Sequence, residues 1–199
     1  MRLEILTKKR DPSPLFPVAL ITGDGRSLPS DMGAFLTWGV PHDVMAIGRS
    51  VKEYPGRVLH WANVDGADSK WWAEHLPKRN DGDFPIRHSM GDLPWYDIDW
   101  DVKDEIIYSS EKNDWHGSSS LFAVYACLAL GYKKIVLAGC PLDNKGHWWH
   151  GPECTGPLWL GETYQAWLEF SLTPEAEKVR SLSGYTAIMV GKAFKELCY

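Results

Sequence analysis

The stretch SSSLFAVYACLALGYKKIVLAGC, residues 118–140, decides the fold class of this chain. Apolar residues fill nearly every position of 121–130, and Gly131 is a natural helix C-cap, so the pattern predicts a buried helix. Residues 134–138 form a short aliphatic run that stops at Gly139, which is typical of a buried strand. A buried helix followed directly by a buried strand indicates the parallel sheet and right-handed crossovers of an α/β protein.

The segments on either side extend this pattern. The stretch PVALITGDGRSL, residues 17–28, reads as a strand that enters a glycine-rich turn and then a helix. Other expected strands cover 43–47, 57–62, 105–108 and 179–182, and other expected helices cover 67–77, 161–171 and 184–197. We therefore expect one Rossmann-like domain over 1–199, with a mostly parallel sheet flanked by helices.

Two segments are expected to lie outside this pattern. Residues 1–16 carry charge and prolines, and are predicted to form an N-terminal arm or edge element. Residues 78–104 are predicted to be a loop-rich insertion, in which Asp97, Asp99 and Asp101 form a solvated turn.

Composition excludes several classes of protein. A chain of 199 residues with 44% hydrophobic residues and a net charge of -5 fits a soluble domain and argues against general nucleic-acid binding. No apolar run approaches the roughly 20 residues that span a bilayer, and the N-terminus does not read as a signal peptide, so a cytoplasmic location is expected. The four cysteines are far apart and form no C-x-x-C pair, which favours free thiols over a metal or disulfide framework.

Polar turns are expected to gather where the parallel strands end. In an open α/β sheet, ligands bind beyond the carboxyl ends of the strands, near the point where strand order reverses. The Gly23-x-Gly25 turn and the helix start at 117–120 could each hold an anion with backbone N–H groups and hydroxyls. The alternatives are an ordinary tight turn and a serine N-cap.

Residues 19–28 and 117–140 resemble two signatures of the bacterial sialyltransferase family and of the related MptE-like family, which includes motility-associated flagellin glycosyltransferases. The signatures are V-I-x-G-N-G-P-S-L and S-G-x-x-x-x-x-A-x-x-L-G-Y-x-x-I-x-L-x-G-x-D. The resemblance implies a sialyltransferase-like variant of the GT-A fold that binds a nucleotide, in sialyltransferases the CMP of CMP-sialic acid. It also implies that no metal is obligatory, because hydroxyl and amide donors stabilise the departing phosphate.

The resemblance also implies positions for the nucleotide. The turn from Gly23 to Ser27 would lie at the phosphates, Asn63 at the sugar nucleotide, and the helix start at the nucleotide. The predicted nucleotide-binding residues are Gly23, Asp24, Gly25, Ser27, Gly48, Arg49, Asn63, Gly117, Ser118, Ser119, Gly139, Pro141 and Asp143.

The chain departs from the family pattern at three places. Asp24 and Gly48 each replace an asparagine, and Cys140-Pro141 replaces an acidic residue. Asp24 would repel a phosphate unless it faces a ribose hydroxyl or helix N–H groups, and Arg49 could supply positive charge beside Gly48.

A general base is needed to deprotonate an acceptor hydroxyl, and histidine suits neutral pH. The candidates are His147, His150 and His116, each of which could instead be a loop histidine packed on tryptophan. His147, His150 and Cys154 have spacings that a metal could use, but no fourth ligand is evident, so no metal site is predicted. Many of the 11 tryptophans follow strand ends, which suggests an aromatic rim around the crevice or a protein interface.

Three functions are open from the sequence. The first is transfer of a sugar from a CMP-type donor to an unknown acceptor. The second is an MptE-like pterin pyrophosphokinase, which would need ATP and Mg²⁺ held by carboxylates such as Asp24, Asp65 or Asp143. The third is a non-catalytic nucleotide-binding or structural module, for example one encoded by a phage. The expected partners are a nucleotide or nucleotide sugar and the acceptor, with a homo-oligomer as an open alternative.

Overall fold

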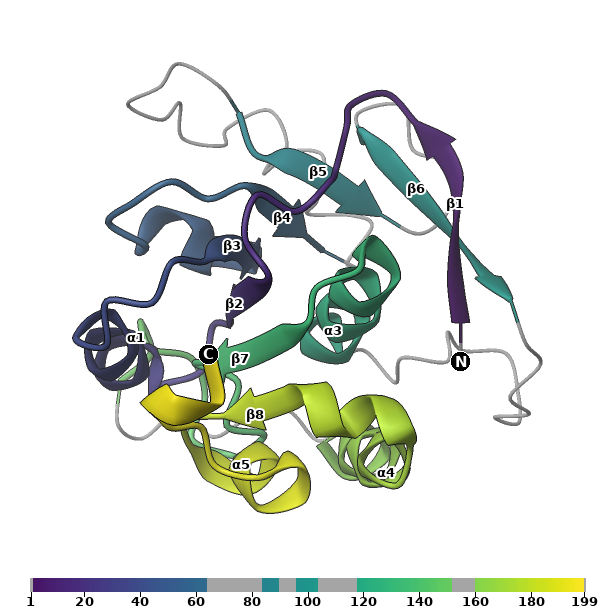
Figure 1. Ribbon diagram of the computed structural model, residues 1–199. Coiled ribbons are helices and arrows are strands. Elements are labelled where there is room, and N and C mark those ends of the chain that lie inside the picture. Colours follow the sequence, from purple (N-terminus) through teal and green to yellow (C-terminus); the bar gives the residue numbers. More distant parts are fainter. Residues whose placement is uncertain (1, 64–83, 90–95, 104–117, 152–159, 199) are drawn as a thin grey trace.

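The computed structural model describes residues 2–63, 84–89, 96–103, 118–151 and 160–198, and its described strands form one sheet (Figure 1). The strand order is β1-β6-β5-β4-β3-β2-β7-β8. β1 pairs antiparallel with β6 at one edge, and all other neighbours are parallel. The strands are β1 (Arg2–Lys8), β2 (Val18–Thr22), β3 (Asp43–Ile47), β4 (His60–Ala62), β5 (Ile86–Ser89), β6 (Ile98–Lys103), β7 (Lys134–Ala138) and β8 (Val179–Ser181).

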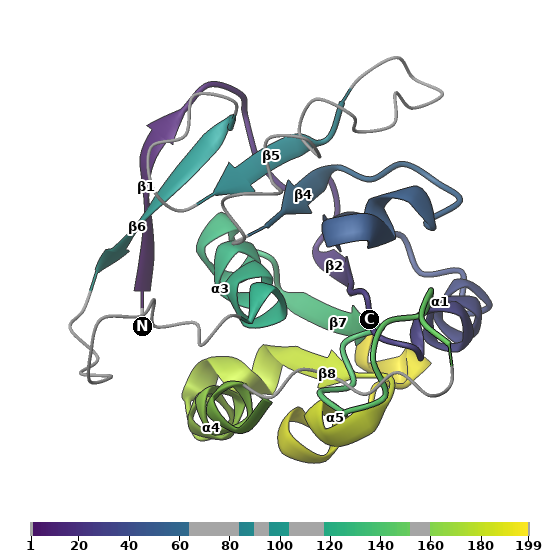
Figure 2. The same ribbon diagram turned by 180° about the vertical axis from the view of Figure 1, so that it is seen from behind.

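Helices cover both faces of the sheet (Figures 1 and 2). The α-helices are α1 (Leu28–Leu36), α3 (Ser119–Leu130), α4 (Leu160–Ser171) and α5 (Gly184–Val190), and the short 3-10 helices are η1 (Gly48–Lys52), η2 (Pro174–Lys178) and η3 (Lys195–Cys198). Alternate residues of β2 enter the two cores. Ala19 and Ile21 pack in the core that includes α3, whereas Val18 and Leu20 pack in the core that includes α1. Burial on both faces explains why the central strands are aliphatic throughout.

The first strand, β1, lies at one edge, and the parallel part of the sheet begins near its middle with β2. From β2 the chain runs through β3, β4 and β5 to β6, and then returns through α3 to β7 on the other side of β2. Strand order therefore reverses between β2 and β7, which is where open α/β sheets bind ligands. This arrangement confirms the predicted α/β class, with a mostly parallel sheet flanked by helices.

Several expected elements differ in the structure. The expected helix over 184–197 ends at Val190, because Gly191 has a φ of +89° that breaks it, and η3 follows separately. The expected strand over 57–62 is limited to β4. The segment 78–104 contains strands β5 and β6, so it is not only loop. Predictions for 67–77 and 105–108 lie outside the described residues.

The predicted solvated turn at Asp97 and Asp99 is wrong. Both side chains are buried, and Asp99 lies within β6. The Asp97 carboxylate accepts hydrogen bonds from the backbone N–H of Arg87 at 3.0 Å and from its guanidinium at 3.0 and 3.2 Å. An ion pair with matched hydrogen bonds lets the charge be buried. Asp101 also lies in β6, rather than in a turn.

A chain of buried polar side chains crosses the sheet beneath α3. The Trp100 indole donates to Nδ1 of His88 at 3.1 Å, so the proton of His88 is on Nε2. Nε2 of His88 donates this proton to Nδ1 of His60 at 3.0 Å. Nε2 of His60 then donates to the Tyr132 hydroxyl at 3.0 Å, and Tyr132 donates to Asp43 at 3.0 Å. Every link has one donor and one acceptor only if both imidazoles are neutral.

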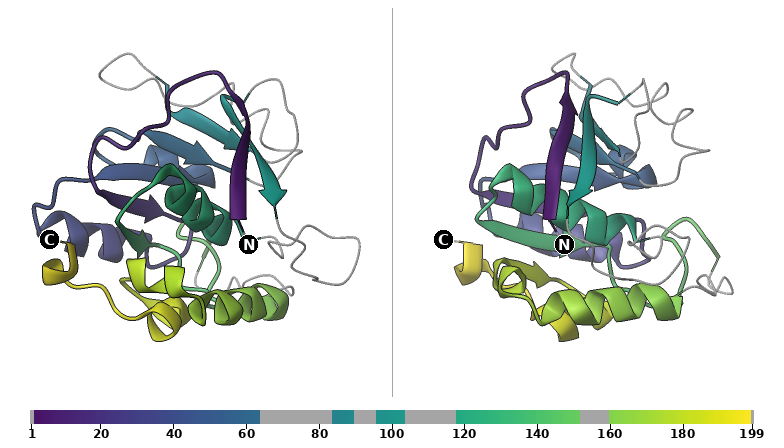
Figure 3. Two further views of the ribbon diagram at one scale, coloured as in Figure 1. Left: turned by 45° about the vertical axis from the view of Figure 1, so that its right-hand side comes forward. Right: turned by 90° about the vertical axis from the view of Figure 1, so that its right-hand side faces the viewer.

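Figure 3 shows the antiparallel pair of β1 and β6 standing at the edge of the sheet opposite to α4 and α5. Within the described ranges, every helix is too short or too polar to cross a bilayer.

Candidate functional site

The turns after β2 and β7 are held against each other at the point where strand order reverses. Gly23 N–H donates to Ala138 O and Gly25 N–H donates to Gly139 O, each at 2.8 Å. A Cβ on Gly23 would lie 2.5 Å from the Cys140 sulfur, and a Cβ on Gly25 would overlap Pro141. Both glycines are therefore required by internal packing, and a phosphate at this turn stays a prediction.

A buried carboxylate ties three turns together beside this point. One oxygen of Asp31 accepts hydrogen bonds from the hydroxyls of Ser27 at 2.8 Å and Ser183 at 2.6 Å, and from Gly139 N–H at 3.0 Å. Asp31 thus links α1 to the turns that follow β7 and β8. The sequence does not single out Asp31 or Ser183 as a site residue. The position of Ser183 in a polar turn after a strand is the signal that could have found it.

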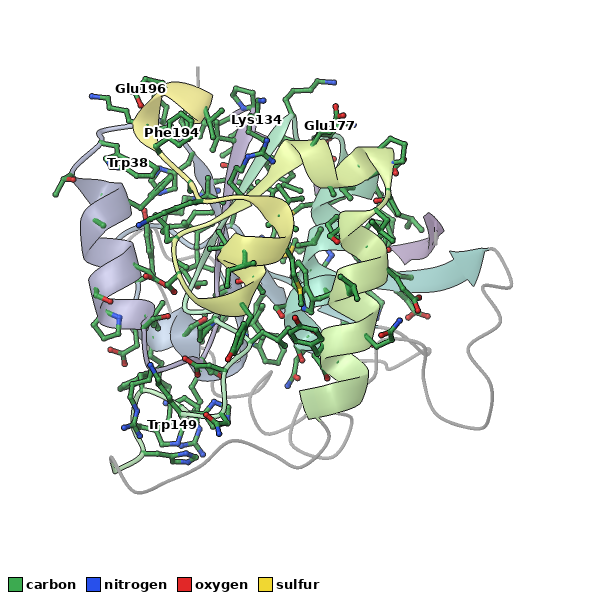
Figure 4. All side chains as sticks on the ribbon, turned by 90° about the horizontal axis from the view of Figure 1, so that it is seen from below. Trp38, Lys134, Trp149, Glu177, Phe194 and Glu196 are labelled. Carbon is green, nitrogen blue, oxygen red and sulfur yellow. The ribbon has the colours of Figure 1, made fainter. Side chains whose placement is uncertain are left out.

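The loop after β7 folds back over the β2 turn. His147 forms an isolated antiparallel bridge with Gly25, and Trp148 N–H donates to Asp24 O at 3.1 Å. The Arg26 guanidinium holds the end of this loop through the carbonyls of His150 and Gly151, a role that the sequence pattern does not indicate. The loop therefore extends from β7 across β2 and places its aromatic side chains beside Arg49, which follows β3 (Trp149 is labelled in Figure 4).

Asp24 faces helix N–H groups, one of the two orientations that the sequence leaves open. Its Oδ2 accepts from Arg49 N–H at 3.1 Å, at the start of η1. Gly48 has a φ of +52°, and a Cβ there would overlap Oδ2. Burial raises the pKa of Asp24 to about 7, although the N–H groups of Arg49 and Ser50 oppose this change. Oδ1 and the nearby indole N–H of Trp148 are buried without a hydrogen-bond partner.

We expect Asp24→Asn to stabilise the fold at pH 8 and to change it little at pH 5. A carboxyl with a raised pKa binds its proton more tightly in the folded chain, so stability is lost as the pH rises from about 4 to 7 and stays lost above pH 7. A tenfold change in proton affinity on folding corresponds to about 1.4 kcal/mol. We expect a gain of about 2 kcal/mol at pH 8, since asparagine is neutral but a weaker acceptor. Urea unfolding at both pH values measures this, and an equal effect at pH 5 and pH 8 would contradict it.

Four side chains form a cluster above these turns, here called the His147 cluster: the exposed Arg49 and the half-buried His147, Trp149 and His150. The His147 and Trp149 rings stack with centroids 4.5 Å apart and planes 11° from parallel. The Arg49 guanidinium lies 4.6 Å from the centre of the Trp149 ring, as in a cation–π contact. The cluster combines positive charge, an aromatic surface and two imidazoles.

Hydrogen bonds assign different chemistry to the two imidazoles. Nδ1 of His147 lies 3.3 Å from Asp24 O, which can only accept, so Nδ1 carries the proton and Nε2 keeps a lone pair. Burial lowers the pKa of His147, and the nearby positive charge of Arg49 lowers it too, although the hydrogen bond to Asp24 O opposes this change. Nδ1 of His150 instead accepts from His147 N–H at 3.4 Å, so its Nε2 carries a proton. His147 can accept a proton at Nε2, whereas His150 can donate one.

The other predicted site residues have mostly structural contacts. Ser118 is the N-cap of α3, and its hydroxyl accepts from Leu121 N–H and from the Trp167 indole, each at 3.2 Å. Ser119 is half-buried in the first turn of α3, and Asn63 is buried just after β4. Asp143 accepts from Lys145 N–H at 3.2 Å.

Pro141 contributes its carbonyl to Tyr185 N–H at 2.8 Å, at the start of α5. Predictions for Asp65, His116, Gly117 and Cys154 lie outside the described residues. The described part of the chain contains no group of His, Cys, Asp or Glu side chains arranged to hold a metal ion.

The strand order and the helices on both faces define an open α/β protein of the Rossmann-like type. No protein-family model and no curated protein matches this chain. A solved structure, the MAf glycosyltransferase from Magnetospirillum magneticum AMB-1, is similar in fold with a TM-score of 0.56 at 12% identity. The match covers 92% of this chain and 34% of that chain, so this protein spans about a third of the length of its structural neighbour. The likeness supports the fold, and neither family named from the sequence is shown.

Proposed function

We propose that this protein is a nucleotide-sugar-dependent glycosyltransferase that works at the carboxyl ends of β2, β3 and β7. The observation that carries the proposal is His147, whose Nε2 keeps its lone pair beside a cationic and aromatic cluster at the reversal of strand order. An imidazole held neutral in one tautomer is the usual requirement for a general base. The fold is of the type used by the MAf glycosyltransferase, which supports the proposal.

The reaction needs one proton acceptor and a stabilised leaving group. As the acceptor oxygen attacks the anomeric carbon, its proton moves to Nε2 of His147. The bond between that carbon and the phosphate oxygen breaks, and its electron pair leaves with the nucleotide. Arg49 and the Nε2–H of His150 lie in the same cluster and would stabilise the negative charge on the departing phosphate. These steps use no metal, as the sequence resemblance implies.

We propose a CMP-type donor on the sequence resemblance alone, and the acceptor is a hydroxyl compound of unassigned structure. The pyrophosphokinase alternative would require carboxylates able to hold Mg²⁺ with ATP. Asp24 already binds the amide of Arg49, and Asp143 binds the amide of Lys145 and lies 3.9 Å from its ammonium group. These contacts favour sugar transfer over pyrophosphate transfer.

A nucleotide thermal-shift series tests the proposal. At 100 times its Kd, a ligand adds about 2.7 kcal/mol to the stability of the folded chain. For a chain of this size, that gain raises Tm by about 5–10 °C. We expect CMP or a CMP-sugar to give this increase in Tm, and Arg49→Ala to reduce it.

Two outcomes of the same series would overturn the proposal. One is an unchanged Tm with every cytidine, uridine, guanosine and adenosine nucleotide tried. The other is an increase given only by ATP with Mg²⁺ and abolished by EDTA, which would support the pyrophosphokinase. Nucleotide binding without turnover of any nucleotide sugar would support a non-catalytic module.

A further inference from the structure

A second surface of the molecule, formed by other elements than the His147 cluster, is exposed and apolar. Figure 4 looks onto α4 and α5, which lie side by side under the sheet. The exposed apolar side chains of these helices and of the residue that follows α4 are Tyr164, Leu168, Leu172, Tyr185 and Ile188. They are here called the α4–α5 face.

The spacing of these residues separates an inner and an outer side of α4. Tyr164, Leu168 and Leu172 recur every four residues and are exposed, whereas Ala166, Trp167 and Phe170 are buried in the core. α4 is therefore apolar on two sides, although only one of them is needed to hold it against the sheet. The rings of Tyr164 and Tyr185 lie 6.0 Å apart, which joins the exposed residues of the two helices into one surface.

The α4–α5 face has both a hollow and projecting side chains. A hollow of about 460 Å³ is lined by Leu172, Pro174, Met189 and Val190, among others. Leu172, at the edge of the hollow, is 81% exposed, and Ile188, next in the chain to the lining residue Met189, is 78% exposed. In a twofold dimer the same surface is used on both copies, so it must contain both a projection and a recess. The projection of each copy can then fit the recess of the other.

The charges at this face suit a second copy of the chain better than a strongly charged partner. The five apolar residues are uncharged, and the two charged residues that line the hollow, Glu177 and Arg180, have opposite signs. A copy rotated by the twofold axis can set opposite charges across such a rim. The whole chain has a net charge of -5, so two copies repel each other over most of their surfaces. An uncharged face is where this repulsion is smallest. A mixed rim also lacks the Lys and Arg excess of surfaces that bind anionic lipid.

We propose that the α4–α5 face is the interface of a homodimer. α4 is about 18 Å long. Two helices side by side offer several hundred Å² of contact area on each copy, which is at the low end for specific interfaces. The dimer is therefore expected to dissociate at micromolar concentrations rather than to be obligate. Dimer formation would also brace α5, whose Tyr185 N–H and Thr186 hydroxyl hold the turn after β7.

Sedimentation velocity of the purified chain over a wide concentration range tests the proposal. The average mass should rise from 22.5 kDa toward twice that value as concentration increases. The double variant Leu172→Asp with Ile188→Asp should weaken association at least tenfold. Both positions are mostly exposed, so its Tm should stay close to that of the parent, which separates lost association from lost folding.

The matched control is Leu15→Asp, at an exposed leucine between β1 and β2. It should leave the dimer unchanged. A chain that stays monomeric at every concentration overturns the proposal, as does a dimer that survives in the double variant or weakens equally in the control. Binding of the monomer to neutral phosphatidylcholine vesicles would also overturn it, since the face would then serve a lipid surface.

Discussion

His147→Ala is expected to slow sugar transfer by about 10²–10⁴-fold, the usual contribution of a general base. Nucleotide binding should persist, because the nucleotide contacts proposed for Arg49 and His150 remain. The rate should fall because Asp24 O holds His147 in the tautomer that has its lone pair on Nε2, and the alanine variant lacks this proton acceptor. Product formation from a CMP-sugar and a panel of hydroxyl acceptors, followed beside the nucleotide-induced increase in Tm, measures both effects.

His150→Ala provides the matched comparison, because it removes the second imidazole of the same cluster. His150→Ala should reduce the rate less than His147→Ala does. The protonated Nε2 of His150 can assist the leaving phosphate, but it cannot take the proton from the acceptor hydroxyl. The rate of the parent should rise with pH through the pKa of His147, which lies below its usual range, and this limb should be absent from His147→Ala. A larger loss in His150→Ala would assign the base to His150 and leave the glycosyltransferase proposal intact.

The fold class could be predicted from local patterns, because each central strand carries its own signal. Residues 134–138 are aliphatic throughout, since β7 is buried on both faces, and Gly131 ends α3 with a φ of +94°. The run of residues 43–47 predicts β3 in the same way, because that strand is also buried on both faces. Such signals need no knowledge of distant parts of the chain.

Features that depend on distant partners could not be predicted. Asp97 and Asp99 look like a polar turn in sequence, because only the structure brings Arg87 to Asp97. Gly191 falls inside the helix that the sequence predicts, since a glycine near a helix end does not reveal its φ angle.

The gathering of the polar turns could be predicted, but the contacts among them could not. The turns after β2, β3 and β7 do lie together, as expected from parallel strands. The sequence offers Gly23 and Gly25 as a phosphate-binding turn, whereas the structure shows that a Cβ at either position would overlap the turn after β7, a packing reason that the sequence does not reveal. The pairing of Gly25 with His147 joins residues far apart in the chain, so no local pattern reports it.

The polar chain through His60 and His88 has an equally large expected effect, on stability rather than on activity. Burial lowers the pKa of His88 to about 3, and burial together with the positive charges of Arg10 and Arg57 lowers the pKa of His60. The two histidines have an ordinary pKa of about 6.5 when the chain is unfolded. As the pH falls below 6.5 the unfolded chain therefore binds up to two protons that the folded chain does not, and stability falls by up to about 3 kcal/mol per pH unit from this source.

Asp24 acts in the opposite direction over the same range. Its raised pKa means that the folded chain binds one proton more than the unfolded chain between about pH 4 and 7. This uptake offsets about half of the stability that the two histidines lose per pH unit. The stability of the parent chain should therefore fall about half as steeply below pH 6.5 as that of Asp24→Asn.

Urea unfolding at pH 7.5, 6.5, 5.5 and 4.5, on the parent and on Asp24→Asn, separates the two contributions. The free energy of unfolding should fall in both proteins below pH 6.5, and more steeply in the variant. A stability that stays flat down to pH 4.5 in Asp24→Asn would mean that His60 or His88 takes up a proton inside the fold. That result would contradict the neutral chain from Trp100 to Asp43, because a protonated imidazole has no acceptor to offer Trp100 or His88.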